Sequence, residues 1–161
     1  MIDDIDRSII SHLQINGRAP YTKIAEELNL TEGSVRRRVK KLIEAGVMQI
    51  VAIVEPHALG WNETGMIGIT VQAHRIEDVA DAVSRLPEVS YLAQAAGEFD
   101  LFAEVFCKDR EHFVSFLNEK LQQIPGVERT QSFIILKMHK LSYRWGEAEP
   151  PRVKHTIQTL E

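Results

Sequence analysis

The sequence TEGSVRRRVKKLIEAG at residues 31–46 decides the fold of the N-terminal part of the chain. Thr31 is a typical N-cap, Glu32 adds negative charge at the correct helix end, and Gly46 stops the pattern. These features predict an amphipathic helix between Thr31 and Gly46. Its apolar stripe is formed by side chains at helical spacing: Val35, Val39, Leu42 and Ile43.

Two shorter helices are predicted before this one. The first ends at Gly17, and the second runs from Pro20, which is tolerated in a first turn, to Asn29. A three-residue turn separates the second helix from the one after Thr31. This is the helix-turn-helix arrangement, in which the later helix enters the major groove of DNA. The first helix has apolar residues at helical spacing behind three acidic cap candidates: Ile2, Ile5, Ile9 and Leu13 behind Asp3, Asp4 and Asp6.

Five of the six residues from Arg36 to Lys41 are basic. A basic helical face is often only solvated, but its position in a helix-turn-helix favours DNA. Arg38 lies nearest the apolar stripe, so we expect it to be structural and paired with Asp6. Arg37, Lys41 and Ser34 are expected in the groove, and the start of the second helix is expected on phosphates. The predicted DNA-binding residues are Arg18, Thr22, Lys23, Thr31, Gly33, Ser34, Arg36, Arg37, Lys40 and Lys41.

The sequence VMQIVAIV at residues 47–54 is apolar and β-branched, and it predicts a strand that serves as a wing or a tether. Pro56, Gly60 and Gly65 then predict a hinge over residues 56–65. We therefore expect a winged helix-turn-helix domain at residues 1–55, joined through a β hinge to the rest of the chain.

Two similar βαβ units follow the hinge, and the phrases LPEV and IPGV that precede their last strands lie 38 residues apart. This order predicts an α+β, ferredoxin-like βαββαβ domain over residues 66–140, with four antiparallel strands and both helices on one face. The other face would expose alternate members of FIILKM, which predicts a dimer that packs sheet on sheet. A tail at 141–161 completes the chain. The predicted strands and helices span 66–72, 76–86, 90–95, 101–106, 113–121 and 132–138.

The segment AAGEFD at residues 95–100 lies between the two units. Small residues and a glycine before Asp100 are typical of a tight turn with solvated acids. They also suit a site where backbone groups and Asp100 hold the head group of an amino acid. The residues alone leave both alternatives open.

Composition and charge exclude several classes of protein. The net charge of −4 argues against a wholly basic surface, and no apolar run approaches the ~18 residues of a membrane helix. The N-terminus is acidic and unlike a signal peptide, and a single cysteine, Cys107, fits a reducing cytoplasm. The six histidines show no ligand-spaced pair. We expect a cytoplasmic protein with no catalytic residues, no metal and no cofactor.

The chain resembles the Lrp/AsnC (leucine-responsive or feast/famine) transcriptional regulators along nearly its whole length. Five segments carry the resemblance in order: IDDIDRSIISHLQINGR, IAEELNLTEGSVRRRVKKLIEAGVM, LG at 59–60, GEFDLF and IPGVERTQSFIILK. The resemblance implies an amino-acid-sensing C-terminal domain, dimers that pair through their sheets, and further assembly, commonly into octamers. Thr31 and Gly33 stand where the family commonly has serine and a polar residue, so the operator sequence stays open.

Carried over onto this sequence, the family's effector site lies at the contact between dimers. Gly97, Phe99 and Asp100 match its glycine-x-aromatic-aspartate segment, and Thr130, Gln131 and Ser132 match the polar stretch after the PGV turn. The resemblance thus favours the binding-site interpretation of Asp100 over the turn.

Three functions remain consistent with the sequence. The first is a regulator that binds an operator in double-stranded DNA and responds to an amino acid through its oligomeric assembly. The second is an enzyme like the siroheme decarboxylases, which share the two-domain architecture; the strand at 90–95 lacks the histidine-containing segment expected of them. The third is an amino-acid sensor that acts on a protein partner.

Overall fold

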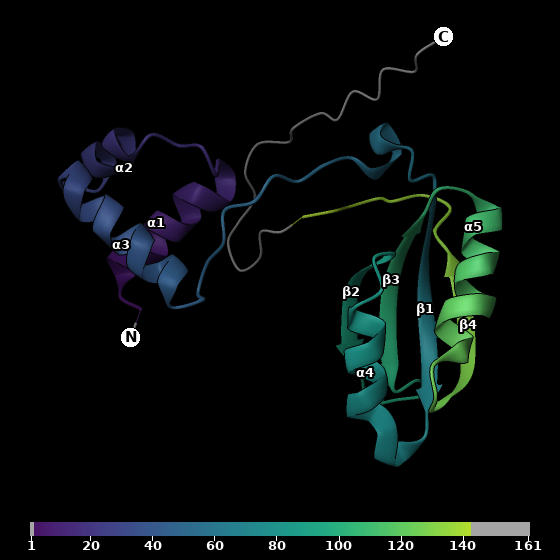
Figure 1. Ribbon diagram of the computed structural model, residues 1–161. Helices are drawn as coiled ribbons and strands as arrows, with labels where there is room; N and C mark the ends of the chain where they lie inside the picture. The colour runs from purple at the N-terminus through teal and green to yellow at the C-terminus, as the bar shows by residue number, and fades with distance from the viewer. Residues whose placement is uncertain (1, 143–161) are drawn as a thin grey trace, which may run out of the picture. The chain divides into compact units, whose positions relative to one another are not determined.

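The computed structural model describes residues 2–142, which form two compact units (Figure 1). Residues up to Ala52 make up the first unit and Ile53–His139 the second. Most of the tail expected at 141–161 lies outside the described residues. The first unit contains three helices: α1 (Asp4–Ile15), α2 (Tyr21–Glu27) and α3 (Glu32–Glu44).

Local capping explains where these helices begin. Asp3 is the N-cap of α1 and forms a capping box with Asp6: the Asp6 amide donates to the Asp3 carboxylate at 2.8 Å, and the Asp3 amide donates back to Asp6 at 3.2 Å. The Thr31 hydroxyl accepts from the Ser34 amide at 3.2 Å and caps α3. The predicted starts of α1 and α3 are confirmed.

The three helices enclose a small apolar core. The turn between α2 and α3 is closed by Asn29 at a φ of 54°. Ile43, which the sequence placed in the apolar stripe, is 42% exposed instead. The buried core residues are Ile9, Leu13, Ile24, Ala25, Val35 and Val39.

The strand predicted over 47–54 is absent from the described chain, so the prediction of a β wing and a β hinge was wrong. The segment has no secondary structure, and Val51 and Ile53 are 69% and 61% exposed. β-branched sequence favours a strand only where a second strand can pair with it, and the described chain offers none here. The predicted hinge contains a 3-10 helix at Pro56–Leu59. Its last glycine, Gly65, belongs to a strand and lies buried against Phe113.

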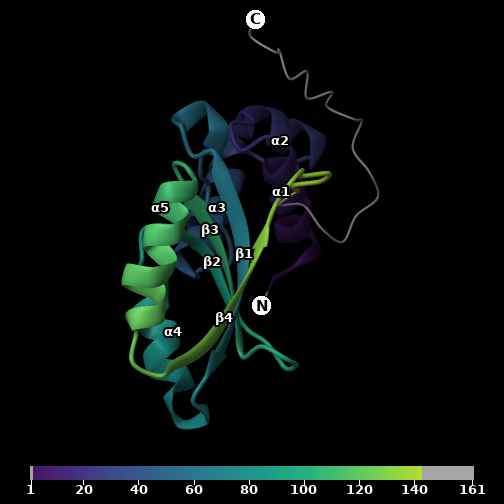
Figure 2. The ribbon, with the colours of Figure 1, turned by 90° about the vertical axis from the view of Figure 1, so that its right-hand side faces the viewer.

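The second unit has the predicted ferredoxin-like arrangement. Its antiparallel sheet has the order β2-β3-β1-β4, and Figure 2 shows both helices on the same side of it. The last helix, α5, continues through a π turn at Phe116–Lys120 and a 3-10 turn at Leu121–Gln123. The elements are β1 (Glu63–Val71), α4 (Ile76–Ser84), β2 (Val89–Gln94), β3 (Leu101–Cys107), α5 (Arg110–Ser115) and β4 (Val127–Ile134).

The last strand lies earlier in the sequence than predicted. Gly126, at a φ of 108°, turns the chain directly into Val127, so pairing starts there rather than near residue 132. The Ile135 amide still donates to the Thr64 carbonyl at 2.9 Å. Because β1 begins at Glu63, residues beyond this point have no strand to pair with, and Leu136 is 94% exposed.

Strand alternation gives the sheet two different faces. Odd-numbered residues of β1 and β3, such as Ile67 and Val105, pack against the helices. Even-numbered residues point to the other side, which we call the open face, because neither helix covers it. In the register, Gly68 lies between Phe102 and Gln131, and Met66 lies beside Phe133. Phe133 on this face is 43% exposed, in line with the predicted apolar surface.

Candidate DNA-binding surface and effector loop

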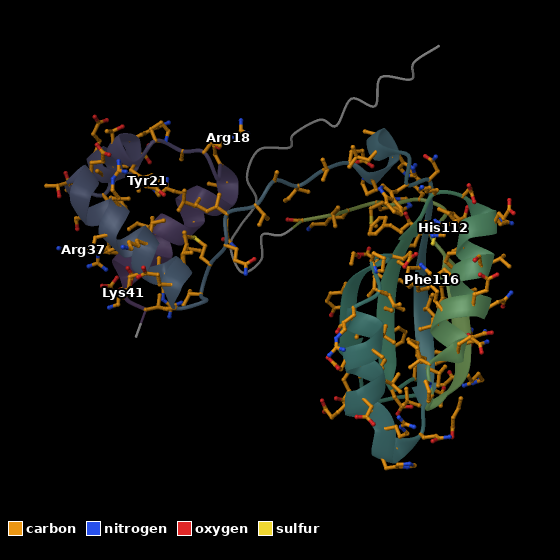
Figure 3. The ribbon with its side chains drawn as sticks, viewed as in Figure 1. Arg18, Tyr21, Arg37, Lys41, His112 and Phe116 are labelled. Carbon is orange, nitrogen blue, oxygen red and sulfur yellow. The ribbon has the colours of Figure 1, made fainter. Side chains whose placement is uncertain are left out.

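The exposed side of α3 presents two cations without partners. Val35, Val39 and Leu42 are buried toward the core, which turns the opposite side of the helix outward. Arg37 and Lys41 lie there one turn apart, and both are exposed (Figure 3). Within residues 2–142 no ion pair involves either side chain, so both are free to meet an external anion.

Arg38 is hydrogen-bonded to α1 at the partly exposed edge of the helical unit. Its guanidinium donates to Asp6 at 2.7 Å and to Asp3 at 2.8 Å, which confirms the predicted pairing with α1. The Asp6 amide, and then the Arg38 guanidinium, hold the pKa of Asp3 below its ordinary value. The two carboxylates raise the pKa of Arg38 in return. Arg38 therefore fixes the orientation of α3 against α1.

Arg36 and Lys40 have partners within the helices. The Arg36 side chain lies over the Tyr21 ring at 5.7 Å from its centroid and forms an ion pair with Glu32. Lys40 pairs with Glu44 at 3.7 Å. Both remain exposed, so these surface pairs can open for an external phosphate.

The remaining predicted DNA-binding residues are spread over the N-terminal unit. Thr22 and Lys23 are exposed in the first turn of α2, where Lys23 pairs with Glu27 at 3.9 Å. Arg18 lies on the connection between α1 and α2, away from Arg37 and Lys41 (Figure 3). Three further predicted residues lie at the start of α3: Thr31, which is its N-cap, Gly33, which is exposed, and Ser34, which is half-buried.

The segment from Ala95 to Asp100 is hydrogen-bonded to the end of β1. We call it the effector loop, because the sequence predicts that it binds the effector. The Asp100 amide donates to the Ile69 carbonyl at 3.0 Å, and one carboxylate oxygen of Asp100 accepts from the Val71 amide at 2.8 Å. The Ala95 amide donates to the Asp100 carbonyl at 2.9 Å. Asp100 is half-buried, and its second carboxylate oxygen has no hydrogen-bond partner within residues 2–142.

Phe99, predicted to bind the effector, is only 6% exposed. Its ring packs edge-on against Phe102 at 5.5 Å and Phe133 at 6.3 Å between centroids. The Arg129 guanidinium lies 5.5 Å from the Phe99 centroid and pairs with Glu98 at 3.3 Å. The sequence analysis missed Arg129. Alternation along β4 could have found it, since Arg129 and Phe133 share one side of a strand.

Strand alternation also separates the three predicted residues of β4. Thr130 accepts from the Gln122 amide at 2.9 Å on the helix side, and Ser132 follows it on that side. Gln131 faces the other way, beside Gly68. A surface hollow of about 340 Å³ lies next to Thr130. It is lined by Gln122, Val127, Glu128, Arg129 and Thr130.

A buried carboxylate, absent from the sequence predictions, lies beneath α5. Glu88 is 4% exposed and accepts from Lys120 at 2.6 Å, while the His112 ring lies 3.1 Å away. Burial pushes the pKa of Glu88 upward, but the hydrogen bonds from Lys120, from its own backbone and from His112 outweigh it and leave that pKa below its ordinary value. Burial and the charge of Glu88 raise the pKa of the Cys107 thiol to about 11, so this thiol stays protonated.

Residues 2–142 contain neither a metal-binding cluster nor a helix that could span a membrane. No group of three or more His, Cys, Asp or Glu side chains is placed there to hold a metal ion. No helix in the same range has the length and apolar character needed to cross a membrane.

A helix-turn-helix with exposed cations on its second helix, followed by a ferredoxin-like unit, defines a two-part DNA-binding protein. The chain belongs to the Lrp/AsnC family: residues 2–43 match the AsnC-type helix-turn-helix domain and residues 64–145 match the Lrp/AsnC ligand binding domain.

Curated relatives of similar length support this assignment. The chain is 38% identical over 140 residues to the HTH-type transcriptional regulator FL11 of Pyrococcus abyssi, covering 86% of this chain and 92% of the relative. It is 31% identical over 141 residues to the HTH-type transcriptional regulator Ptr1 of Methanocaldococcus jannaschii, covering 87% and 95%. These relatives are transcriptional regulators, not enzymes.

Solved structures agree over most of the chain. The AsnC structure from E. coli aligns with a TM-score of 0.79 at 26% identity, covering 88% of this chain and 96% of that one. A transcriptional regulator from Neisseria meningitidis in complex with L-Met aligns with a TM-score of 0.81 at 28% identity, covering 91% and 97%. A feast or famine regulatory protein from M. tuberculosis complexed with L-methionine aligns with a TM-score of 0.82 at 26% identity, covering 90% and 99%.

Proposed function

We propose that this protein is a cytoplasmic transcriptional regulator that reads an operator in double-stranded DNA with α3 and responds to an amino acid. Residues 1–55 contain the DNA-binding domain, residues 56–62 connect it to the sheet, and residues 63–140 sense the effector and carry the assembly. One observation carries the DNA-binding part: Arg37 and Lys41 are exposed and lack partners in the described chain, on the second helix of a helix-turn-helix.

Contacts to DNA divide into two groups. Arg37, Lys41 and Ser34 reach base edges, where an arginine can bond guanine through two hydrogen bonds. The other predicted residues hold phosphates and fix the register of the protein on the duplex without reading sequence. They are Arg18, Thr22, Lys23, Thr31, Gly33, Arg36 and Lys40.

The effector is an amino acid that binds at the effector loop and β4. Two similar proteins, from N. meningitidis and M. tuberculosis, hold L-methionine in their structures, which supports a ligand of this class. The free oxygen of Asp100 suits an ammonium group, and backbone groups around Gly97 suit a carboxylate. Phe99 supplies an apolar wall. Gln131, which lies beside Gly68 on the open face, completes the site with groups from a second chain, whereas Thr130 and Ser132 lie on the helix side of β4.

A second copy of the chain covers the open face. Neither helix packs on it, and it carries aromatic side chains that a soluble monomer rarely leaves in water. We propose a homodimer that packs sheet on sheet and then assembles further into an octamer. Linked helix-turn-helix units multiply weak half-site contacts, so an effector that changes the assembly also changes operator occupancy.

DNA binding by the full chain is the experiment that tests this proposal. A fragment from upstream of the protein's own gene and a scrambled fragment of equal length are compared by fluorescence anisotropy at equal ionic strength. Specific binding to the first fragment supports a regulator. Equal or absent binding to both contradicts it, and favours a sensor that acts on a protein partner.

A further inference from the structure

Gly68 makes room for Phe99 on the open face. A Cβ atom built on Gly68 would lie 2.6 Å from two atoms of the Phe99 ring and 2.8 Å from a third. Real Cβ atoms do not approach other atoms so closely, so the ring occupies the position that any other side chain at residue 68 would need. Gly68 lies in the middle of β1, between β3 and β4. The absence of a side chain at Gly68 therefore leaves a space that the Phe99 ring of the effector loop fills. We call this space the seat of Phe99.

Arg129, on β4, packs against the Phe99 ring. Its guanidinium lies 5.5 Å from the centroid of the Phe99 ring and 3.3 Å from a carboxylate oxygen of Glu98. One side chain thus contacts two consecutive residues of the effector loop, one through the π face and one through charge. In the register Arg129 pairs with Thr70, an even-numbered residue of β1, which puts it on the open face.

The next residue of the loop, Asp100, is held by two hydrogen bonds, one through its carboxylate and one through its amide. Asp100 accepts from the Val71 amide and donates its own amide to the Ile69 carbonyl. The loop therefore has two anchors: the hydrogen bonds at the end of β1 and the seat of Phe99 over Gly68. The first anchor involves the ligand-binding carboxylate, and the second lies among Phe102 and Phe133 on the open face.

We propose that Gly68 and Arg129 are positioning residues that seat Phe99 and thereby join the effector loop to the open face. The inference rests on the proposed function for the roles of that loop and that face. A ligand that binds Asp100 displaces this residue and, with it, the neighbouring Phe99. A displaced Phe99 ring alters the aromatic surface that contacts the second copy. The coupling needs no longer pathway, because Asp100 and Phe99 are consecutive residues.

Gly68→Ala tests the seat, and Gly65→Ala is its matched control. Both substitutions lie on β1, but a Cβ on Gly65 meets Phe113 of α5 on the helix side, at 3.0 Å. Hydrogen–deuterium exchange of the full chain without ligand follows the peptide that contains residues 95–100. We expect exchange about tenfold faster in Gly68→Ala and near wild type in Gly65→Ala. Equal acceleration in both variants, or none in Gly68→Ala, would overturn the proposal.

Arg129→Gln and the double variant Gly68→Ala/Phe99→Ala give independent tests. Arg129→Gln removes both contacts with the loop without adding bulk, so we expect faster exchange there as well. Phe99→Ala removes the ring atoms that the new methyl group would meet, so we expect Gly68→Ala to accelerate loop exchange no further in that background. Faster loop exchange in the double variant than in Phe99→Ala alone would contradict the contact between Gly68 and the Phe99 ring.

Sedimentation of the same variants tests the link to the open face. We expect Gly68→Ala and Arg129→Gln to self-associate more weakly than wild type, and Gly65→Ala to match it. Faster loop exchange in Gly68→Ala and Arg129→Gln, with self-association unchanged from wild type, would overturn the coupling. If wild type itself stays monomeric, the proposed assembly fails, while loop exchange still decides whether Gly68 and Arg129 hold the loop.

Discussion

The Arg38 guanidinium of α3 donates to the Asp6 carboxylate of α1 across 2.7 Å. Asp6 also belongs to the capping box that starts α1. One carboxylate therefore serves both the start of one helix and the placement of another. The neighbouring residue, Arg37, has no ion pair within the described chain and points to the outside. The two adjacent arginines thus have different roles: Arg38 links α3 to α1, and Arg37 faces solvent.

Arg38→Ala is expected to lower the thermal stability of the protein and to weaken DNA binding, because α3 loses its tie to α1. Asp6→Ala is expected to lower stability as well, and the double variant should lose less than the sum of the two. Thermal unfolding of the four proteins measures this coupling. Additive losses would contradict a direct interaction between Arg38 and Asp6.

Arg37→Ala is expected to weaken operator binding by about 1–3 kcal/mol and to leave stability and self-association unchanged, since the side chain contacts DNA rather than protein. Arg85→Ala is the control, because Arg85 is also an exposed arginine, located at the C-cap of α4 in the other unit and paired with Asp81. Fluorescence anisotropy measures affinity and sedimentation measures assembly. A loss of assembly in Arg37→Ala would mean that the exposed side of α3 was misassigned.

Asp100→Asn separates the two tasks of Asp100. The amide oxygen of asparagine still accepts from the Val71 amide, but the charge that pairs with an ammonium group is gone. We expect the loop to keep its structure and DNA binding to persist, while affinity for the effector falls at least about tenfold. Calorimetry with L-methionine and the other amino acids measures this. Unchanged affinity would exclude Asp100 as the ammonium partner.

Glu88 predicts a pH dependence of stability. Its pKa in the folded protein lies below the ordinary value of 4.5, so the ionised form stabilises the fold, and this contribution is lost as the pH falls through the folded-state pKa. Glu88→Gln is expected to be less stable than wild type at pH 7, with a difference that shrinks below about pH 4.5. Thermal unfolding across this pH range measures it. A difference that grows toward low pH would contradict the assigned sign.

Much of the fold could be predicted because its signals are local. Asp3 and Thr31 cap helices through residues three positions away, and the spacing of Arg38 relative to Val35 and Val39 placed it on the α1 side of α3.

The remaining features depend on partners that are distant in sequence. Residues 47–54 have strand propensity, but propensity does not supply a second strand. Phe99 is buried because Gly68 lies under it, and that contact follows from sheet register rather than from either local pattern. Lys120 reaches Glu88 from a π turn, which the spacing of apolar residues in α5 did not predict.

The salt dependence of operator affinity tests most directly whether the exposed side of α3 meets DNA. Each phosphate contact that is lost reduces the slope of log affinity against log salt by about 0.9. We predict a steep slope for wild type and a slope shallower by about 0.9 in Lys23→Ala, where one phosphate contact is lost. In Arg37→Ala, where the loss is at a base, we predict a near-parallel line of lower affinity. A wild-type affinity that does not change with salt would contradict the account. Full wild-type affinity in both variants would contradict it as well.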